Sequence, residues 1–213
     1  MSRPSGPQVS SRKQPKQTRS TELVAAILEA AMQVLANEGA SRFTTARVAE
    51  RAGVSIGSVY QYFPNKAAIL FRLQSDEWRQ TSEMLRHILA DRHTAPPERL
   101  RKLVHAFVRS EWEEAEVRLA LDDAAPLYRD TPEAKEARSS AEQIMGAFMR
   151  DALPAASDAT RQRTGDLITL TLSSVGKRIS ATAQTGDEIE RQAEAMADMF
   201  CAWLQEITRR ESP

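Results

Sequence analysis

The stretch FTTARVAERAGVSIGSVYQYF, residues 43–63, decides the fold of the N-terminal part of this 213-residue chain. Thr44 or Thr45 is a good N-cap for a short helix, because a hydroxyl oxygen can accept a hydrogen bond from a free amide of the first turn. Gly53 supplies the left-handed backbone that ends this helix and turns the chain. Ser55 then caps a second short helix, which is expected to run from about Ile56 to Tyr62. Two short helices joined by a tight glycine turn predict a helix-turn-helix over about residues 44–63.

The second helix of this motif has a clear division between inward and outward positions. Val59 and Phe63 lie four residues apart and therefore share the inward face. The positions left for the outer surface are Ile56, Gly57, Ser58, Tyr60, Gln61 and Tyr62. Because the second helix of a helix-turn-helix enters the major groove, the pattern predicts duplex DNA as the partner.

The rest of the chain is expected to be helical, so the fold class is all-α with about nine helices. A first helix begins near Ser20 and ends at the stop signal Asn37-Glu38-Gly39, and Asn65 caps a long helix that reaches about Leu89. Pro96-Pro97 breaks this pattern, the next apolar stripe runs from Leu100 to Trp112, and a short element is expected between Pro126 and Pro132. The last two helices are predicted at about residues 159–183 and 187–210.

Composition suggests a disordered basic tail over 1–19, followed by a region over 20–66 that contains the helix-turn-helix and by a helical body over 67–213. Nine basic and four acidic residues lie among residues 1–70, leaving 20 basic and 25 acidic residues in the remainder. A basic module on an acidic body suggests that a polyanion binds at one end. The tail is either a solubilising leader or a basic arm that touches DNA.

Several classes of function are not expected. No apolar run approaches the roughly 18 residues of a membrane-spanning helix, and the N-terminus lacks a secretory apolar region, so we expect a cytoplasmic protein without a membrane partner. The single cysteine, Cys201, forms no internal disulfide and is interpreted as a buried apolar residue. His87, His93 and His105 have no metal-ligand spacing. No catalytic constellation is found, so neither an enzyme nor a cofactor is predicted.

The run AGVSIGSVYQYFPNK, residues 52–66, closely resembles the DNA-binding signature of the TetR/AcrR repressors. The resemblance covers about residues 20–70, including Gly39 and the Thr-Thr pair, and beyond residue 70 it is only architectural. It implies a DNA-binding domain over 20–66 and a helical ligand-binding and dimerisation domain over 67–213. It implies that Thr44, Tyr62 and Lys66 hold phosphates. It also implies that base edges or nearby backbone are met by Thr45, Arg47, Ser55, Ile56, Gly57, Ser58, Tyr60 and Gln61. Gln61 could form a pair of hydrogen bonds with adenine, and Ile56 or Tyr60 could pack against thymine methyl groups.

The last two predicted helices carry apolar stripes. Ile189, Ala193, Met196, Phe200, Trp203 and Ile207 are spaced 4, 3, 4, 3, 4, which is the seam of a coiled coil. In the resembled family the last two helices form a four-helix interface between two subunits. A homodimer interface is therefore expected at Ile168, Leu172, Val175, Ile179, Met196, Phe200, Trp203 and Ile207. Alternatively, these stripes face only the core of their own chain.

A set of aromatic and sulfur-containing residues in the middle helices suits an adaptable apolar pocket for a small molecule. Its members are Phe71, Trp78, Phe107, Trp112, Tyr128, Met145 and Phe148. Each of them alone is also typical of plain core. The effector is therefore expected to be largely apolar.

These observations predict a homodimeric, ligand-responsive repressor that binds a palindromic operator on the nucleoid and is released from it by a small molecule. The alternative within DNA binding is an activator, or a regulator without a small-molecule effector. A more remote alternative is a helical partner-binding module.

Overall fold

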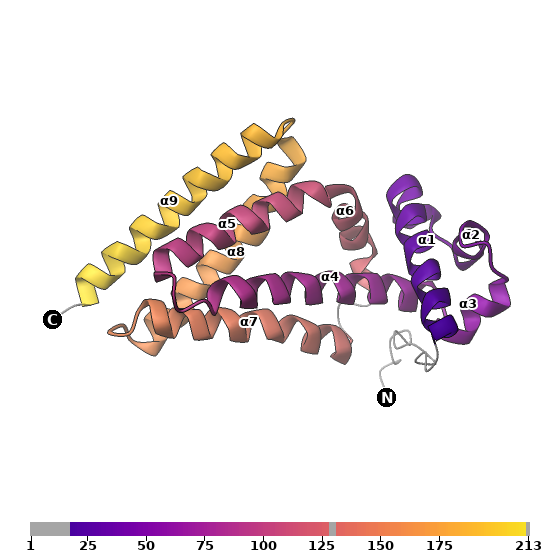
Figure 1. Cartoon of the computed structure of the whole chain (residues 1–213), viewed down its shortest axis with the longest axis horizontal. Helices are drawn as coiled ribbons and strands as arrows, with labels where there is room; N and C mark the ends of the chain where they lie inside the picture. The colour runs from indigo at the N-terminus through magenta and orange to yellow at the C-terminus, as the bar shows by residue number, and fades with distance from the viewer. Residues whose placement is uncertain (1–17, 128–130, 212–213) are drawn as a thin grey trace, which may run out of the picture. The chain divides into compact units, whose positions relative to one another are not determined.

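The computed structural model describes residues 18–127 and 131–211, and in this part of the chain it is all-α, as predicted (Figure 1). The elements are α1 Thr18–Arg42, α2 Thr45–Arg51, α3 Ile56–Tyr62, α4 Lys66–Leu89, α5 Pro96–Glu113, α6 Ala115–Ala124, the 3-10 turn η1 Ala125–Leu127, α7 Pro132–Ala152, α8 Asp158–Thr182 and α9 Gly186–Glu211. Residue contacts divide the described chain into two compact units. Unit 1 holds residues 18–79, 116–127 and 131–138, and unit 2 holds residues 80–115 and 139–211.

Most helix boundaries agree with those predicted from the capping and helix-breaking residues of the sequence. The helix α3 has the predicted bounds, and α8 and α9 begin and end within one residue of the prediction. The chain leaves helical geometry at Gly39, whose φ is 74°, as the stop signal indicated. The tail predicted as disordered lies outside the described residues, except that Thr18 and Arg19 already belong to α1.

One helix, α6, was not predicted. No proline or glycine separates it from α5; the break is a change of backbone direction at Glu114, with φ −110° and ψ 15°. The short element expected between Pro126 and Pro132 falls largely on residues 128–130, which lie outside the described part of the chain.

Unit 1 is built on one apolar core to which α1, α2, α3, the first part of α4 and α6 all contribute. Its largest fully buried side chains include Ile27, Leu35, Phe43, Phe63 and Leu121. Phe43 and Phe63 stand at the two ends of the helix-turn-helix stretch, so the motif is fixed to the core at both ends. Burial of a large apolar side chain contributes about 1.5–3 kcal/mol.

The core of unit 2 is formed by the end of α4 with α5, α7, α8 and α9. Helix α5 makes its most extensive contacts with α9 and then with α8. Gly176 allows the approach of α8 to α5, because a Cβ there would lie 3.2 Å from the Phe107 ring.

Among the described residues, one helical segment, Ser20–Arg42, is long and apolar enough to meet a length-and-hydropathy criterion for a membrane span, with a mean hydropathy of 1.3. Polar residues interrupt its apolar runs, which is why the sequence shows no continuous apolar stretch. Core helices of soluble proteins meet the same criterion, and Val24, Ile27 and Ala31 of this segment are buried in the core of unit 1. The criterion is therefore weak evidence for a membrane span.

Candidate nucleic-acid interface

Two side-chain caps hold the N-terminal ends of the two helices of the motif. The Thr44 hydroxyl accepts a hydrogen bond from the Arg47 amide at 3.3 Å. The Ser55 hydroxyl accepts one from the Ser58 amide at 3.0 Å, and the two serine hydroxyls are 2.8 Å apart. The predicted caps at Thr44 and Ser55 are therefore confirmed. Loss of such a cap typically costs about 1 kcal/mol of stability.

Asn65 caps the helix that follows the motif, as predicted. Its side-chain oxygen accepts a hydrogen bond from the Ala68 amide at 2.9 Å. This cap fixes the start of α4, and Lys66, the first residue of α4, is exposed.

The turn between α2 and α3 depends on a single glycine. Gly53 has a φ of 67°, and its amide donates to the Glu50 carbonyl at 3.1 Å. The next amide, that of Val54, donates to the Ala49 carbonyl at 3.0 Å, which satisfies the end of α2. A Cβ built on Gly53 would meet no atom within 4 Å, so the glycine is required by its backbone conformation alone.

Helix α3 has one buried and one exposed face, as the sequence predicted. Val59 and Phe63 are almost completely buried. Ile56 and Tyr60, by contrast, are 46% and 41% exposed, and Gln61 is also exposed. A seven-residue helix with a large aliphatic and an aromatic side chain in solvent, beside an amide, is suited to the methyl groups and polar edges of a DNA groove.

Two residues that the resemblance placed on DNA lie in the core of unit 1. Tyr62 is 6% exposed and Thr45 is 8% exposed. The physical reason is helical periodicity: Tyr62 follows the inward Val59 by three residues, and Thr45 precedes the inward Val48 by three. The assignment of the Tyr62 side chain to the outer surface is therefore wrong.

The basic residues of α2 are held by partners in the first helix. The Arg47 guanidinium forms an ion pair with Glu38, and the Arg51 Nε donates to the Gln33 side-chain oxygen at 2.7 Å. Arg47 is still 39% exposed at its side chain. To bind DNA, the Arg47 side chain would have to leave Glu38 or share it.

The residues predicted to form one ligand pocket are divided between the two units. Phe71 and Trp78 pack in the core of unit 1, whereas Phe107, Trp112, Met145 and Phe148 pack in unit 2. Tyr128 lies outside the described residues. Two cavities of unit 2 are lined instead by a mixture of charged and apolar residues. One, of about 610 Å³ between α7 and α8, includes Met145, and a smaller one of about 170 Å³ includes Phe148.

Most of the residues predicted to contact a second subunit are buried in the core of their own unit. Ile168, Leu172, Met196, Phe200 and Ile207 are all less than 10% exposed, and Ile179 and Trp203 pack partly against the same core. Val175 alone is largely exposed, at 42%. The alternative interpretation, that these stripes face the chain's own core, therefore describes all but Val175.

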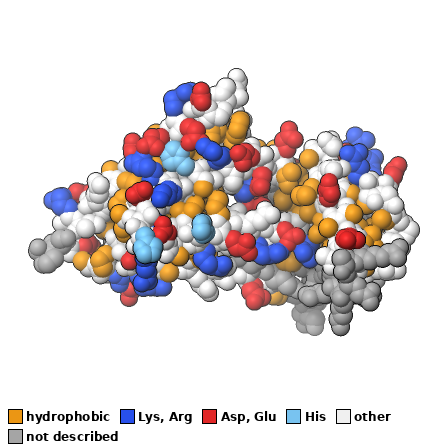
Figure 2. Space-filling model, in the orientation of Figure 1, with side chains coloured by type: hydrophobic (Ala, Val, Ile, Leu, Met, Phe, Trp, Pro, Cys, Tyr) orange, Lys and Arg blue, Asp and Glu red, His pale blue; other side chains and the backbone are white. Residues whose placement is uncertain are grey.

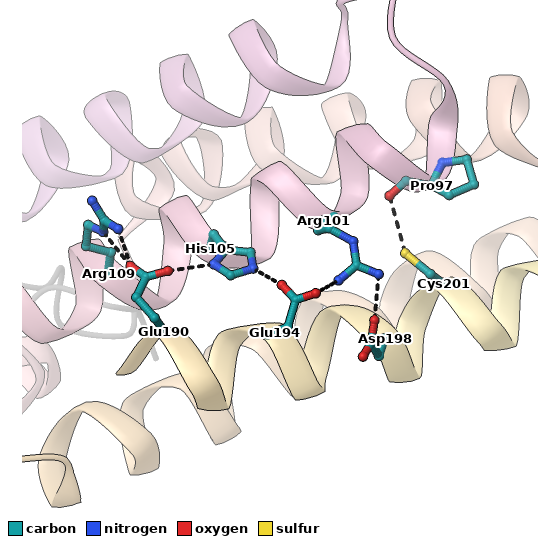
Figure 3. A network of polar contacts seen from close by, with 8 residues as sticks. All are labelled: Pro97, Arg101, His105, Arg109, Glu190, Glu194, Asp198 and Cys201. Carbon is teal, nitrogen blue, oxygen red and sulfur yellow. Dashed lines mark hydrogen bonds and ion pairs between the residues drawn. The ribbon is translucent and has the colours of Figure 1, made fainter. Parts of the chain in front are cut away.

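A ladder of charged side chains joins α5 to α9 beside this core (Figure 3). His105 lies between two carboxylates, with Nδ1 2.9 Å from Glu190 and Nε2 2.7 Å from Glu194. Arg101 pairs with Glu194 and Asp198, and Arg109 pairs with Glu190. The Arg109 and His105 hydrogen bonds hold the pKa of Glu190 below its ordinary value. Acidic, basic and histidine side chains are accordingly mixed over α5 and α9 in Figure 2.

Sequence reasoning missed this ladder, although its signal is present. Basic residues recur every four positions at 101, 105 and 109, and acidic residues recur likewise at 190, 194 and 198. Within the described residues, no group of three His, Cys, Asp or Glu side chains is placed to hold a metal ion.

Two family descriptions match the chain. "Bacterial regulatory proteins, tetR family" matches residues 27–73, which include the helix-turn-helix, and "Tetracyclin repressor-like, C-terminal domain" matches residues 95–207. The second match alone spans more than half of the chain.

Curated relatives resemble only a part of the chain. The fatty acid metabolism regulator protein of Bacillus subtilis (strain 168) is 33% identical over 69 residues, which are 32% of this chain and 36% of that protein. The nucleoid occlusion factor SlmA of Vibrio cholerae is 52% identical over 42 residues, 19% of this chain and 21% of that protein. The chain thus matches about a third or less of the length of these relatives.

Solved structures resemble nearly the whole chain in fold. The transcriptional regulator FadR of Bacillus subtilis, solved in complex with stearoyl-CoA, has a TM-score of 0.69 at 17% identity and covers 84% of this chain and 98% of that one. At this identity the likeness concerns the fold. The two family matches, the helix-turn-helix geometry and this shared fold agree, and the chain belongs to the TetR/AcrR family of transcriptional regulators.

Proposed function

We propose that the protein is a homodimeric, ligand-responsive repressor of the cytoplasm that binds a palindromic operator and releases it when a small molecule binds. The observation that carries the DNA-binding part is the exposed face of α3. Val59 and Phe63 anchor this helix in the core of unit 1, whereas Ile56, Tyr60 and Gln61 remain available to base edges. The DNA-binding domain is proposed to span residues 20–66, and the body residues 67–213.

The division between positioning and reading contacts can be assigned from exposure. Lys66, at the start of α4, and Thr44, at the start of α2, are exposed and suit phosphate contacts that set the register. Ser55, Ile56, Gly57, Tyr60 and Gln61 are exposed on or beside α3 and suit the groove. Arg47 and the half-buried Ser58 are weaker candidates for DNA contacts. The buried Thr45 and Tyr62 are expected to support DNA binding indirectly, by stabilising the fold of the motif.

Genomic fragments selected by the purified protein would supply an operator for binding measurements by fluorescence anisotropy. Lys66→Ala should weaken binding to all fragments and lower the slope of log K against log salt by about 1. Gln61→Ala should alter base preference and leave that slope unchanged. Lys102→Ala removes an exposed positive charge of α5, outside the proposed DNA and dimer surfaces, and is the matched control. Absence of saturable, sequence-dependent DNA binding by the wild type would refute the proposal.

A dimer is proposed because one helix-turn-helix reads only a few base pairs, whereas two copies related by a twofold axis, about 34–36 Å apart, read a palindrome. The surface offered for it is the exposed side of α8 and α9, not the buried seam. Leu167 and Met199 are 44% and 53% exposed there, and Ala195 and Ala202 extend the stripe on α9.

Sedimentation velocity tests this surface. Leu167→Glu and Met199→Glu should each shift the protein from dimer to monomer, since a charge would be buried between the copies. Leu119→Glu, at an exposed leucine of α6, is the matched control and should leave the dimer intact. A wild type that sediments as a monomer at micromolar concentration would refute the interface.

Release by a ligand is proposed from the family and from the cavities of unit 2. A ligand changes DNA affinity only by its different affinity for the two states of the protein. Because the Bacillus subtilis FadR structure contains stearoyl-CoA, long-chain acyl-CoA is the first effector to test. The measurement is the operator affinity with and without stearoyl-CoA, with free coenzyme A as the control; an unchanged affinity would reject this effector.

A further inference from the structure

A buried arginine stands where α4, α5 and α7 meet in unit 2. Arg99 is 3% exposed and lies in the first turns of α5. One of its terminal nitrogens donates to the Leu89 carbonyl at 2.6 Å, and the other pairs with Asp151. The guanidinium lies 5.4 Å from the centre of the Phe148 ring. Its Nε is buried and has no hydrogen-bond partner in the described part of the chain.

Arg99 lines a cavity of about 170 Å³ together with two further arginines. Arg86 comes from the last turn of α4 and Arg92 from the turn that follows it. Both are exposed, and neither forms an ion pair with any side chain that the structure describes. Asp151 is the one carboxylate of the lining, so the cavity carries three positive charges against one negative charge.

The energetics of this arrangement call for an additional anion. Like charges gathered around one small volume repel one another, and a buried donor without a partner is destabilising. Asp151 offsets one guanidinium only. Guanidinium groups are planar forks that bind carboxylate and phosphate oxygens with paired hydrogen bonds.

We propose that this cavity binds the phosphate or carboxylate group of a small molecule, held by Arg86, Arg92 and Arg99. This proposal rests on the ligand-responsive function proposed above. It adds an anionic group to the effector, which the aromatic residues of the sequence predicted only to be largely apolar. Ile144, Ala147 and Phe148 of α7 also line the cavity and would contact the carbon atoms next to the anionic group. The volume is suited to one such group with a few carbon atoms, so a larger effector would extend out of the cavity.

The direct test is binding of inorganic phosphate to the full-length protein, followed by phosphorus NMR at constant ionic strength with chloride as the balancing anion. Butanoate, followed by proton NMR, is the parallel probe for the carboxylate group with an apolar tail. The wild type should bind at least one of the two saturably, with a Kd in about the millimolar range. The anion that binds more tightly identifies the group.

Three variants locate the site. Arg86→Gln combined with Arg92→Gln should weaken binding about tenfold or more, because both exposed donors lose their charge. Arg163→Gln combined with Arg191→Gln removes the same charge from exposed positions of α8 and α9 and should leave the affinity unchanged. Ala147→Phe, at an exposed position of α7, fills the cavity without altering its charge and should also abolish binding.

DNA binding of the same proteins separates this inference from the proposed function. The double variant Arg86→Gln and Arg92→Gln should retain operator binding, since both residues lie in unit 2. If neither anion binds saturably up to about 10 mM, or if the cavity variants bind as the wild type does, the anion site is wrong while DNA binding stands. If the wild type binds no operator, the proposed function fails whatever the anion measurements show.

Discussion

Replacing Gly53 and Gly57 by alanine, one at a time, should change the stability of unit 1 in opposite directions. Gly53 has a φ of 67°, and no atom lies within 4 Å of an added Cβ. The left-handed conformation costs a residue with a Cβ about 1–2 kcal/mol, and alanine recovers about 0.4–1 kcal/mol by restricting the unfolded chain. Gly53→Ala should therefore destabilise the fold by about 1 kcal/mol.

Gly57 has ordinary helical geometry inside α3, and its added Cβ would lie 3.7 Å from the Ser55 hydroxyl, an ordinary contact. Alanine is favoured over glycine in a helix, so Gly57→Ala should stabilise the fold by about 0.5–1 kcal/mol. The same substitution adds a methyl group to the face proposed to approach DNA. Operator affinity should therefore fall while stability rises.

Urea unfolding followed by circular dichroism gives the midpoint for each variant, and hydrogen exchange of the Val59 and Phe63 amides reports on α3 locally. The two midpoints should separate by the equivalent of about 1.5–2 kcal/mol, with the wild type between them. Gly53→Asn should recover part of the loss, since asparagine tolerates positive φ. Shifts of the same sign and size in both alanine variants would refute the reasoning from φ.

Three other expectations concern unit 2. Gly165→Ala should lower the thermal midpoint at a cost of about 1–3 kcal/mol, because its Cβ would lie 3.2 Å from the Cγ atoms of Met145 and Met149. Gly146→Ala, 3.8 Å from the Arg150 guanidinium, should not lower it, and equal losses would contradict the packing argument. Burial raises the pKa of the Cys201 thiol, whose Sγ lies 3.3 Å from the Pro97 carbonyl, so iodoacetamide should label Cys201 rapidly only after unfolding. Hydrogen bonds from Arg209 and Arg210 lower the pKa of Glu206 from 4.5 to about 2, so these ion pairs should persist above pH 4.5 and be lost as the pH falls towards 2. A carboxyl NMR titration of Glu206 tests this, and a midpoint at 4.5 would contradict it.

The fold could be predicted largely because its helix ends carry distinctive residues. Ser55, Asn65, Gly53 and the Pro96-Pro97 pair each act within one turn of their own position, so the sequence alone reveals them. The division between α5 and α6 could not be predicted, since the change of direction at Glu114 involves no residue that disfavours a helix.

The candidate site was predicted less completely, because it depends on which residues from different helices lie next to one another. Helical spacing gave the inward positions Val59 and Phe63, but Tyr62 was assigned to the outer surface although it shares their buried face. The arginine-lined cavity was missed because Arg86, Arg99 and Asp151 come from three helices. No spacing within one helix indicates that such residues meet.

The charged ladder between α5 and α9 explains why the coiled-coil seam of α9 does not identify the dimer face. A 3.5-residue repeat indicates that a helix packs along its length against another helix, but not whether that helix belongs to the same chain. Arg101, His105 and Arg109 face carboxylates at 198, 194 and 190 in reverse order, which matches an antiparallel pairing of α5 and α9 within the chain. In neutral form the His105 ring donates through one nitrogen only, so both of its carboxylate contacts are hydrogen bonds only when the ring is protonated. Since the seam of α9 is occupied by α5, a second copy can meet α9 only on its outer side, where Met199 is exposed.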